Sequence, residues 1–134
     1  MSERENVVVV EQIFASFGRG DVPAVLSALV EEVEWFIPGP PDVIPYAGMR
    51  RGRAEVLRFF EALGGAVEFE RFEPREFIAQ GDAVVALGFE RGRVRATSRA
   101  FDNPWAMAFR LRDGKVVSFY SYEDTASVAA AFSQ

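Results

Sequence analysis

The chain has 134 residues, 49% of them hydrophobic and 26% charged, which is typical of one globular domain over residues 1–134 and excludes a disordered chain. It contains no Cys and no His, so thiol nucleophiles, disulfides, His-based triads and most transition-metal sites are excluded, and Asp and Glu are the general bases available near neutral pH. The net charge of −5 is unfavourable for binding a nucleic-acid backbone.

The N-terminal segment predicts an amphipathic helix. Apolar residues recur at helical spacing over residues 10–17, and Ser2 followed by Glu5 is a capping-box pattern. The apolar run at residues 7–10 is far shorter than the roughly 20 residues of a membrane span, and the first residues are charged. We therefore expect a cytoplasmic protein that does not enter a membrane.

Two more helices and a short strand are expected before the middle of the chain. A second helix begins after the Asp21 cap and is predicted to end near residues 31–32, and a strand follows at residues 33–37. Four residues rich in proline then begin a loop that is expected to reach about residue 49. The third helix begins near Arg53 and is predicted to end at the glycine pair of residues 64–65.

The second half of the chain predicts an antiparallel meander followed by a last short helix. We expect four strands, near residues 67–79, 83–90, 94–111 and 115–122. The turn between the second and third is assigned to residues 91–93, and bulges or bends are expected at Pro74 and at residues 102–104. A helix capped by Asp124 or Thr125 ends the chain.

This order of elements resembles a known family, and several short motifs support the likeness. The motifs are Phe17–Asp21, Tyr46–Gly48, Arg51–Arg53, Arg112–Val117, Tyr122 and Asp124–Thr125. Together they resemble the SnoaL-like branch of the nuclear transport factor 2-like superfamily, which includes ketosteroid isomerases and polyketide cyclases. The resemblance implies an α+β fold in which a curved, cone-shaped, largely antiparallel sheet of mixed strand order packs against three N-terminal helices. It also implies a short C-terminal helix and a homodimer formed through the outer face of the sheet.

The catalytic positions of these relatives are occupied here by residues that cannot do their chemistry. By resemblance, Ile37 stands where ketosteroid isomerases have the general base, and Met107 stands where they have one oxyanion donor. Ile13 and Phe14 occupy the helix positions of the other donor, and Ser121 stands at the acid/base position of the cyclases. No His is present to activate that serine.

Other residues are therefore the candidates for the site. If Ser121 faces the pocket, alternation along its strand directs Val117, Phe119 and Glu123 to the same side. We expect Glu123 to be a catalytic acid or base and Tyr46 a hydrogen-bond donor; the alternatives are a salt bridge at the rim for Glu123 and simple packing for Tyr46. The residues expected to contact a ligand are Phe14, Trp35, Ile37, Phe59, Phe60, Trp105, Met107, Phe119 and Ser121.

These features predict a protein with a pocket for a small hydrophobic molecule. One hypothesis is an isomerase, cyclase or hydratase that acts on a hydrophobic carbonyl compound and needs no cofactor or metal, with Glu123, Tyr46 or Asp42 replacing the missing Asp residues. The alternative is a noncatalytic ligand-binding or dimerisation domain, because Ile37, Met107 and Ser121 occupy the catalytic positions. The sequence favours neither.

Overall fold

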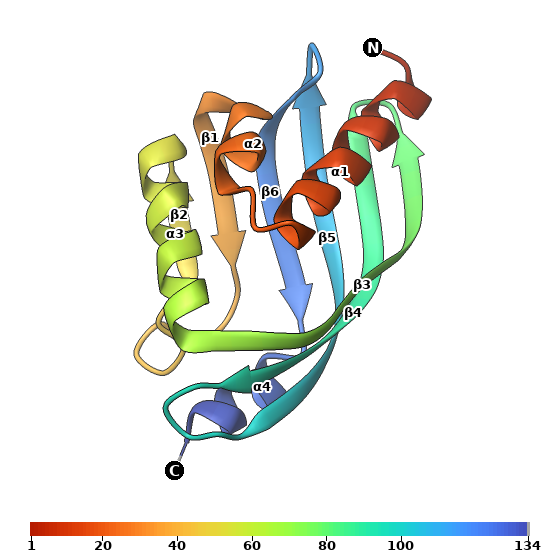
Figure 1. Ribbon diagram of the computed structural model, residues 1–134. Helices are drawn as coiled ribbons and strands as arrows, with labels where there is room; N and C mark the ends of the chain where they lie inside the picture. Colours follow the sequence, from red (N-terminus) through yellow and green to blue (C-terminus); the bar gives the residue numbers. More distant parts are fainter. Residues whose placement is uncertain (134) are drawn as a thin grey trace.

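The computed structural model describes residues 1–133, in which helices pack on one face of a six-stranded sheet (Figure 1). The strand order is β2-β1-β6-β5-β4-β3; β1 and β6 are parallel and the other neighbours antiparallel. The helices are α1 (Glu3–Gly18), α2 (Val22–Ser27), α3 (Arg53–Ala66) and α4 (Thr125–Phe132). The strands are β1 (Leu29–Ile37), β2 (Gly48–Arg51), β3 (Val67–Gln80), β4 (Ala83–Val94), β5 (Ala100–Arg112) and β6 (Lys115–Glu123). The α+β architecture and the element order confirm the expected fold.

The start of α1 and the cap of α2 agree with the sequence, but the predicted length of α2 is wrong. The reciprocal capping box of Ser2 and Glu5 is present, and the Asp21 side chain accepts a hydrogen bond from the Ala24 backbone. The second helix ends at Ser27 instead of near residues 31–32. Leu29 begins β1 because it pairs with the parallel strand β6 and becomes fully buried there, an environment that helical periodicity along one segment does not report.

Two further boundaries in the first half differ from the prediction. The loop expected up to residue 49 ends earlier, since Gly48–Arg51 forms β2 and pairs antiparallel with β1. The third helix continues through Gly64 and Gly65 to Ala66, because neither glycine adopts a positive φ angle and the helix leads directly into β3. Leu57 on this helix is 40% exposed.

The predicted turn at residues 91–93 is wrong, since β4 extends through these residues and the chain reverses at 95–99. Gly92 serves close packing instead: a Cβ atom there would lie 2.5 Å from the Phe101 ring. The register shift beside Pro74 confirms the expected bulge, whereas residues 102–104 pair with β4 without interruption. A register shift between β5 and β6 leaves Val116 fully buried and Val117 half-buried, contrary to the predicted alternation.

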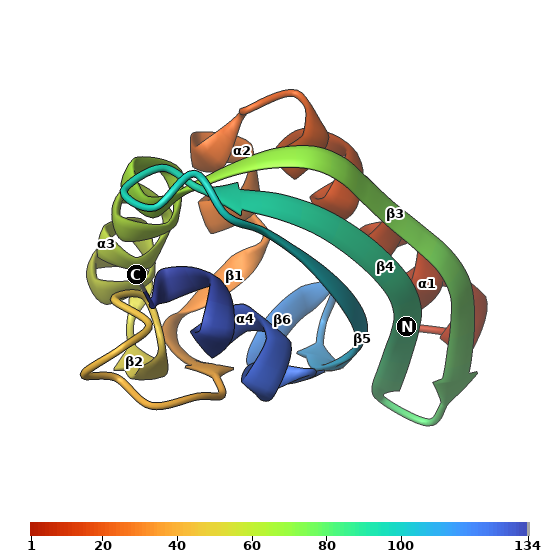
Figure 2. The ribbon, with the colours of Figure 1, turned by 90° about the horizontal axis from the view of Figure 1, so that it is seen from below.

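The sheet curves strongly, and α4 lies across the end of the curve. Figure 2 shows β3, β4 and β5 bending around the short terminal helix, while α1 to α3 cover the inner face. Asp124 caps α4, as expected, and Val128 and Ala131 are its buried residues. Within residues 1–133, no helix has the length and hydrophobicity that crossing a membrane requires.

Candidate functional site

An aromatic cavity lies between the helices and the inner face of the sheet. The space free for water is about 70 Å³, small beside the roughly 300–1,000 Å³ of pockets that hold drug-sized ligands. The lining comes from every helix except α4 and from every strand except β2; it comprises Ile13, Phe14, Phe17, Val25, Trp35, Ile37, Tyr46, Phe59, Phe60, Leu63, Phe69, Phe72, Glu90, Met107, Phe109, Phe119 and Glu123. The phenyl rings that wall the cavity therefore also fill most of it, and a larger ligand has to displace some of them.

Two carboxyl groups face this apolar space. Glu90 on β4 is only 6% exposed, and burial raises its pKa to about 8, with the negative charge of Glu123 adding to the effect. Glu123 lies at the end of β6, and burial also raises the pKa of its carboxyl group above the ordinary value. Within residues 1–133 no arginine or lysine forms an ion pair with either group, although the surface carboxylates Glu34, Glu70 and Glu73 all have such partners.

The carboxyl group of Glu123 is held by two buried side chains. Asn103 donates from Nδ2 to Oε1 of Glu123 over 3.0 Å, and the Ser121 hydroxyl donates to Oε2 over 2.6 Å. The Oδ1 atom of Asn103 accepts the backbone N–H of Asp124 at 2.9 Å. Because a backbone N–H can only donate, this bond determines which way the Asn103 amide points. Asn103 and Ser121 are both completely buried, so the arrangement is rigid.

Tyr46 reaches the same cavity from the proline-rich loop between β1 and β2. It is 4% exposed, and its ring lies 6.2 Å from that of Phe59 and 6.0 Å from that of Phe132 on α4. Burial raises the pKa of its hydroxyl, and the charges of Glu90 and Glu123 raise it further. Tyr46 therefore stays protonated and can donate a hydrogen bond to a ligand.

Most residues predicted to form the site do line the cavity. Both candidate catalytic residues, Glu123 and Tyr46, are among the lining residues, and so are seven of the nine predicted ligand contacts: Phe14, Trp35, Ile37, Phe59, Phe60, Met107 and Phe119. The loop residue Asp42 is exposed and does not line it.

Trp105 and Ser121, also among the expected ligand contacts, do not border the cavity. Trp105 stacks on Phe14 and Phe72 at centroid distances of 5.6 and 5.4 Å, and it occupies the space over Gly88 where a side chain would otherwise lie. The Trp105 ring therefore packs against other core residues and not against the cavity. Ser121 is fully buried, and its hydroxyl donates a hydrogen bond to Glu123, which does line the cavity.

Sequence reasoning missed Glu90 and the contact of Asn103. A signal for Glu90 exists, since alternation from Val84 along β4 places it on the inner face. The mistaken turn at residues 91–93 put Glu90 at a strand end, where a carboxylate is usually exposed. Within the described part of the chain, no three Asp or Glu side chains gather closely enough to hold a metal ion.

The chain belongs to the family of SnoaL-like domains, whose model matches residues 10–119. Its structure is similar to that of an NTF2-like protein from Burkholderia xenovorans, with 41% identity, a TM-score of 0.90 and 99% of both chains covered. An NTF2-like protein of unknown function from Burkholderia pseudomallei is 29% identical over the full length of both chains, with a TM-score of 0.90.

A third similar structure comes from a co-crystallisation. TerC, co-crystallised with polyporic acid, shares 25% identity with this chain at a TM-score of 0.85, covering 96% of this chain and 98% of TerC. A comparison with curated proteins finds no match.

Proposed function

We propose that the protein binds a flat, largely apolar carbonyl compound in the aromatic cavity and moves a proton on it, with two carboxyl groups as acid and base. The observation that carries this proposal is that Glu90 and Glu123 face the same apolar space without a cationic partner among residues 1–133. Burying two carboxyl groups in this way costs free energy, and such perturbed pairs are typical of acid–base catalysis.

The chemistry follows from the three polar groups of the cavity. A carboxylate removes a proton from the carbon beside the carbonyl group, and the aromatic surroundings strengthen it as a base. The developing negative charge on the carbonyl oxygen needs a donor, and Tyr46 or a protonated glutamate supplies one. Isomerisation and cyclisation begin with such a proton transfer, and in water addition the same carboxylate takes its proton from the attacking water instead. The proposal covers all three classes of reaction.

Two further observations support a ring-containing ligand. Eight of the seventeen lining residues are phenylalanines, which pack well against flat apolar molecules. TerC, which shares this fold, was crystallised with polyporic acid.

The competing proposal is a domain that binds a ligand without changing it. It is favoured by Ile37 and Met107, apolar residues that line the cavity at positions where related isomerases carry polar groups. The buried pair of Glu90 and Glu123 argues against this competing proposal. A purely apolar ligand would form no hydrogen bond with these carboxyl groups and would not offset the free energy that their burial costs.

Mass spectrometry separates these two proposals. The purified protein is first weighed under native conditions and then denatured, so that any bound compound is extracted and identified. The compound is next incubated with fresh protein in D₂O. A product with altered mass or altered isomeric form supports proton transfer; a compound recovered unchanged and without deuterium supports binding alone.

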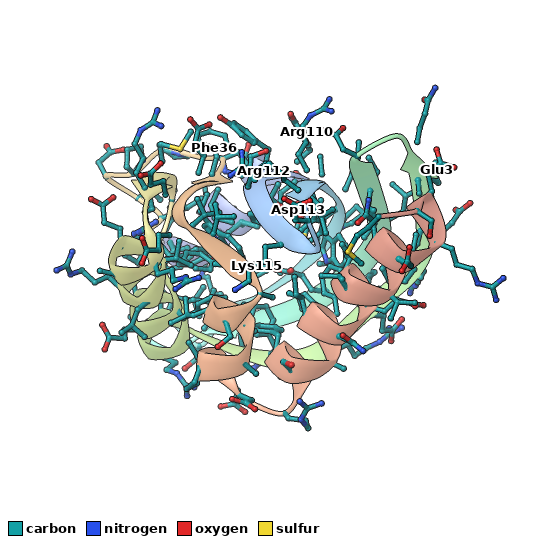
Figure 3. All side chains as sticks on the ribbon, turned by 90° about the horizontal axis from the view of Figure 1, so that it is seen from above. Glu3, Phe36, Arg110, Arg112, Asp113 and Lys115 are labelled. Atoms are coloured by element: carbon teal, nitrogen blue, oxygen red, sulfur yellow. The ribbon has the colours of Figure 1, made fainter. Side chains whose placement is uncertain are left out.

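We further propose that the protein forms a homodimer through the outer face of the sheet. Figure 3 shows Phe36 and Arg110 on the side of the sheet away from the helices, and Tyr122 on the same face is 58% exposed. The ring of Phe36 lies 5.6 Å from that of Tyr120, which extends the aromatic surface. Sedimentation at micromolar concentration tests this: the wild type is expected to be a dimer and Tyr122→Glu a monomer, and a monomeric wild type contradicts it.

A further inference from the structure

The two buried glutamates differ in the number of side-chain hydrogen bonds that their carboxyl groups accept. Both oxygens of Glu123 accept a hydrogen bond, at 3.0 Å from Asn103 and at 2.6 Å from Ser121. A distance of 2.6 Å is typical of a hydroxyl that donates to an ionised carboxylate. A proton on either oxygen of Glu123 would compete with one of these donors.

Glu90 lacks this support. It pairs with Asn103 across β4 and β5, and the nearby amide lowers the pKa of Glu90, but burial and the charge of Glu123 outweigh that effect. The amide NH2 group of Asn103 points toward Glu123 because Oδ1 of Asn103 accepts the backbone N–H of Asp124. Tyr46 is the other titratable side chain that lines the cavity within residues 1–133, and it stays neutral.

We propose that the resting protein holds one proton between the two glutamates, that this proton resides on Glu90, and that Asn103 and Ser121 keep Glu123 ionised. Asn103 is then a positioning residue, which acts on a ligand through Glu123. The charge distribution stands by itself, whereas the roles of base for Glu123 and acid for Glu90 rest on the proposed function.

The reaction that this arrangement allows is balanced in atoms and charge. The Glu123 carboxylate takes a proton from the carbon beside the carbonyl group, so the C–H bond breaks and an O–H bond forms on Glu123. The electron pair moves toward the carbonyl oxygen, which takes the proton of Glu90. The ligand is then a neutral enol, and Glu90 carries the single negative charge. Return of the proton on Glu123 to a different carbon of a conjugated enol, while the enol hydroxyl gives its proton back to Glu90, completes an isomerisation and restores both glutamates.

Carboxylate titration by NMR tests the charge distribution without any substrate. Protein labelled with ¹³C at the glutamate carboxyl carbons is titrated, and Glu90→Gln and Glu123→Gln assign the two signals. In the wild type we expect Glu90 to lose its proton near pH 8, with Glu123 already ionised at lower pH. In Asn103→Leu, which keeps the size but removes the donor, the titration of Glu123 is expected to shift to higher pH and approach that of Glu90.

Two further variants keep the test decisive. Asn6→Leu removes another buried asparagine, on α1, and is expected to leave both titrations unchanged. If Asn103→Leu does not fold, Ser121→Ala removes the second donor and is expected to shift Glu123 in the same direction. The proposal is overturned if Glu90 ionises before Glu123, or if neither donor variant moves the Glu123 signal. Titrations that behave as expected without any turnover would instead leave the charge distribution standing and remove the proposed reaction.

Discussion

The negative charge of Glu123 on β6 raises the pKa of Glu90 on β4, although the two residues lie on strands separated by β5. Asn103 on the intervening strand is paired with Glu90 and donates a hydrogen bond to Glu123, and both carboxyl groups line the same cavity. The chain thus combines a cavity made mostly of hydrocarbon with two groups that exchange protons, and this combination has measurable consequences.

The first consequence is a stability that falls as the pH rises. Folding raises the pKa of Glu90 from 4.5 to about 8, so between these values the unfolded chain releases a proton that the folded protein retains. Unfolding is therefore favoured by up to about 1.4 kcal/mol per pH unit in this window, and no further change is expected from Glu90 below or above it. Glu90→Gln removes this dependence.

Urea unfolding at about pH 5 and about pH 8.5 measures the effect. We expect the midpoint of the wild type to fall between the two conditions and that of Glu90→Gln to fall less. Glu76→Gln, a change of an exposed carboxylate on β3, is the control and should behave like the wild type. Equal pH dependence in the wild type and Glu90→Gln would show that Glu90 is not protonated in the folded state.

A second prediction concerns the close approach of Trp105 to Gly88. A Cβ atom on Gly88 would lie 2.4 Å from the Trp105 ring and 2.6 Å from the backbone oxygen of Glu73, and the backbone cannot move aside easily. Gly88→Ala is expected to destabilise the protein by about 1–3 kcal/mol. Gly64→Ala on α3, where no atom lies within 4 Å, is expected to stabilise it by about 0.5–1 kcal/mol. Thermal unfolding of the pair checks the difference in sign, and a Gly88→Ala protein as stable as wild type would contradict it.

A third prediction concerns access to the cavity. Phe60 on α3 is half-buried, and its ring packs 4.9 Å from that of Phe59 and 5.7 Å from that of Trp35. Since rings fill most of the cavity, Phe60→Ala is expected to bind the fluorescent aromatic probe N-phenyl-1-naphthylamine more strongly than the wild type does. Leu57→Ala, on the same helix but outside the cavity, is the control. Unchanged probe binding in Phe60→Ala would mean that this ring does not limit the available space.

The order of the elements could be predicted from the sequence, because periodicity and capping are local. Ser2 with Glu5, Asp21 and Asp124 all cap helices as their positions suggest. The alternation along β6 also predicts that Glu123 faces the cavity, and Glu123 does line it.

The remaining features depend on contacts between distant segments. Leu29 lies in a strand because it pairs with β6. Gly92 also lies within a strand, and the Phe101 ring occupies the space that a side chain on Gly92 would fill. Without that pairing, the sequence around Gly92 predicts a turn and makes Glu90 the end of a strand. The alternation from Val84 indicates an inward-facing Glu90 only once the register of β4 against β5 shows that the strand continues past this residue.

The central claim is that Glu123 acts as a base on a ligand in the aromatic cavity, and deuterium exchange tests it most directly. The probe is 2-tetralone, a bicyclic aromatic ketone with exchangeable protons beside the carbonyl group, and its uncatalysed exchange in D₂O is measured without protein. We expect the wild type to accelerate this exchange, and Glu123→Gln to lower the accelerated rate by about 100-fold or more, while Glu76→Gln retains it. Exchange at the uncatalysed rate with the wild type, or an undiminished rate with Glu123→Gln, would contradict the claim.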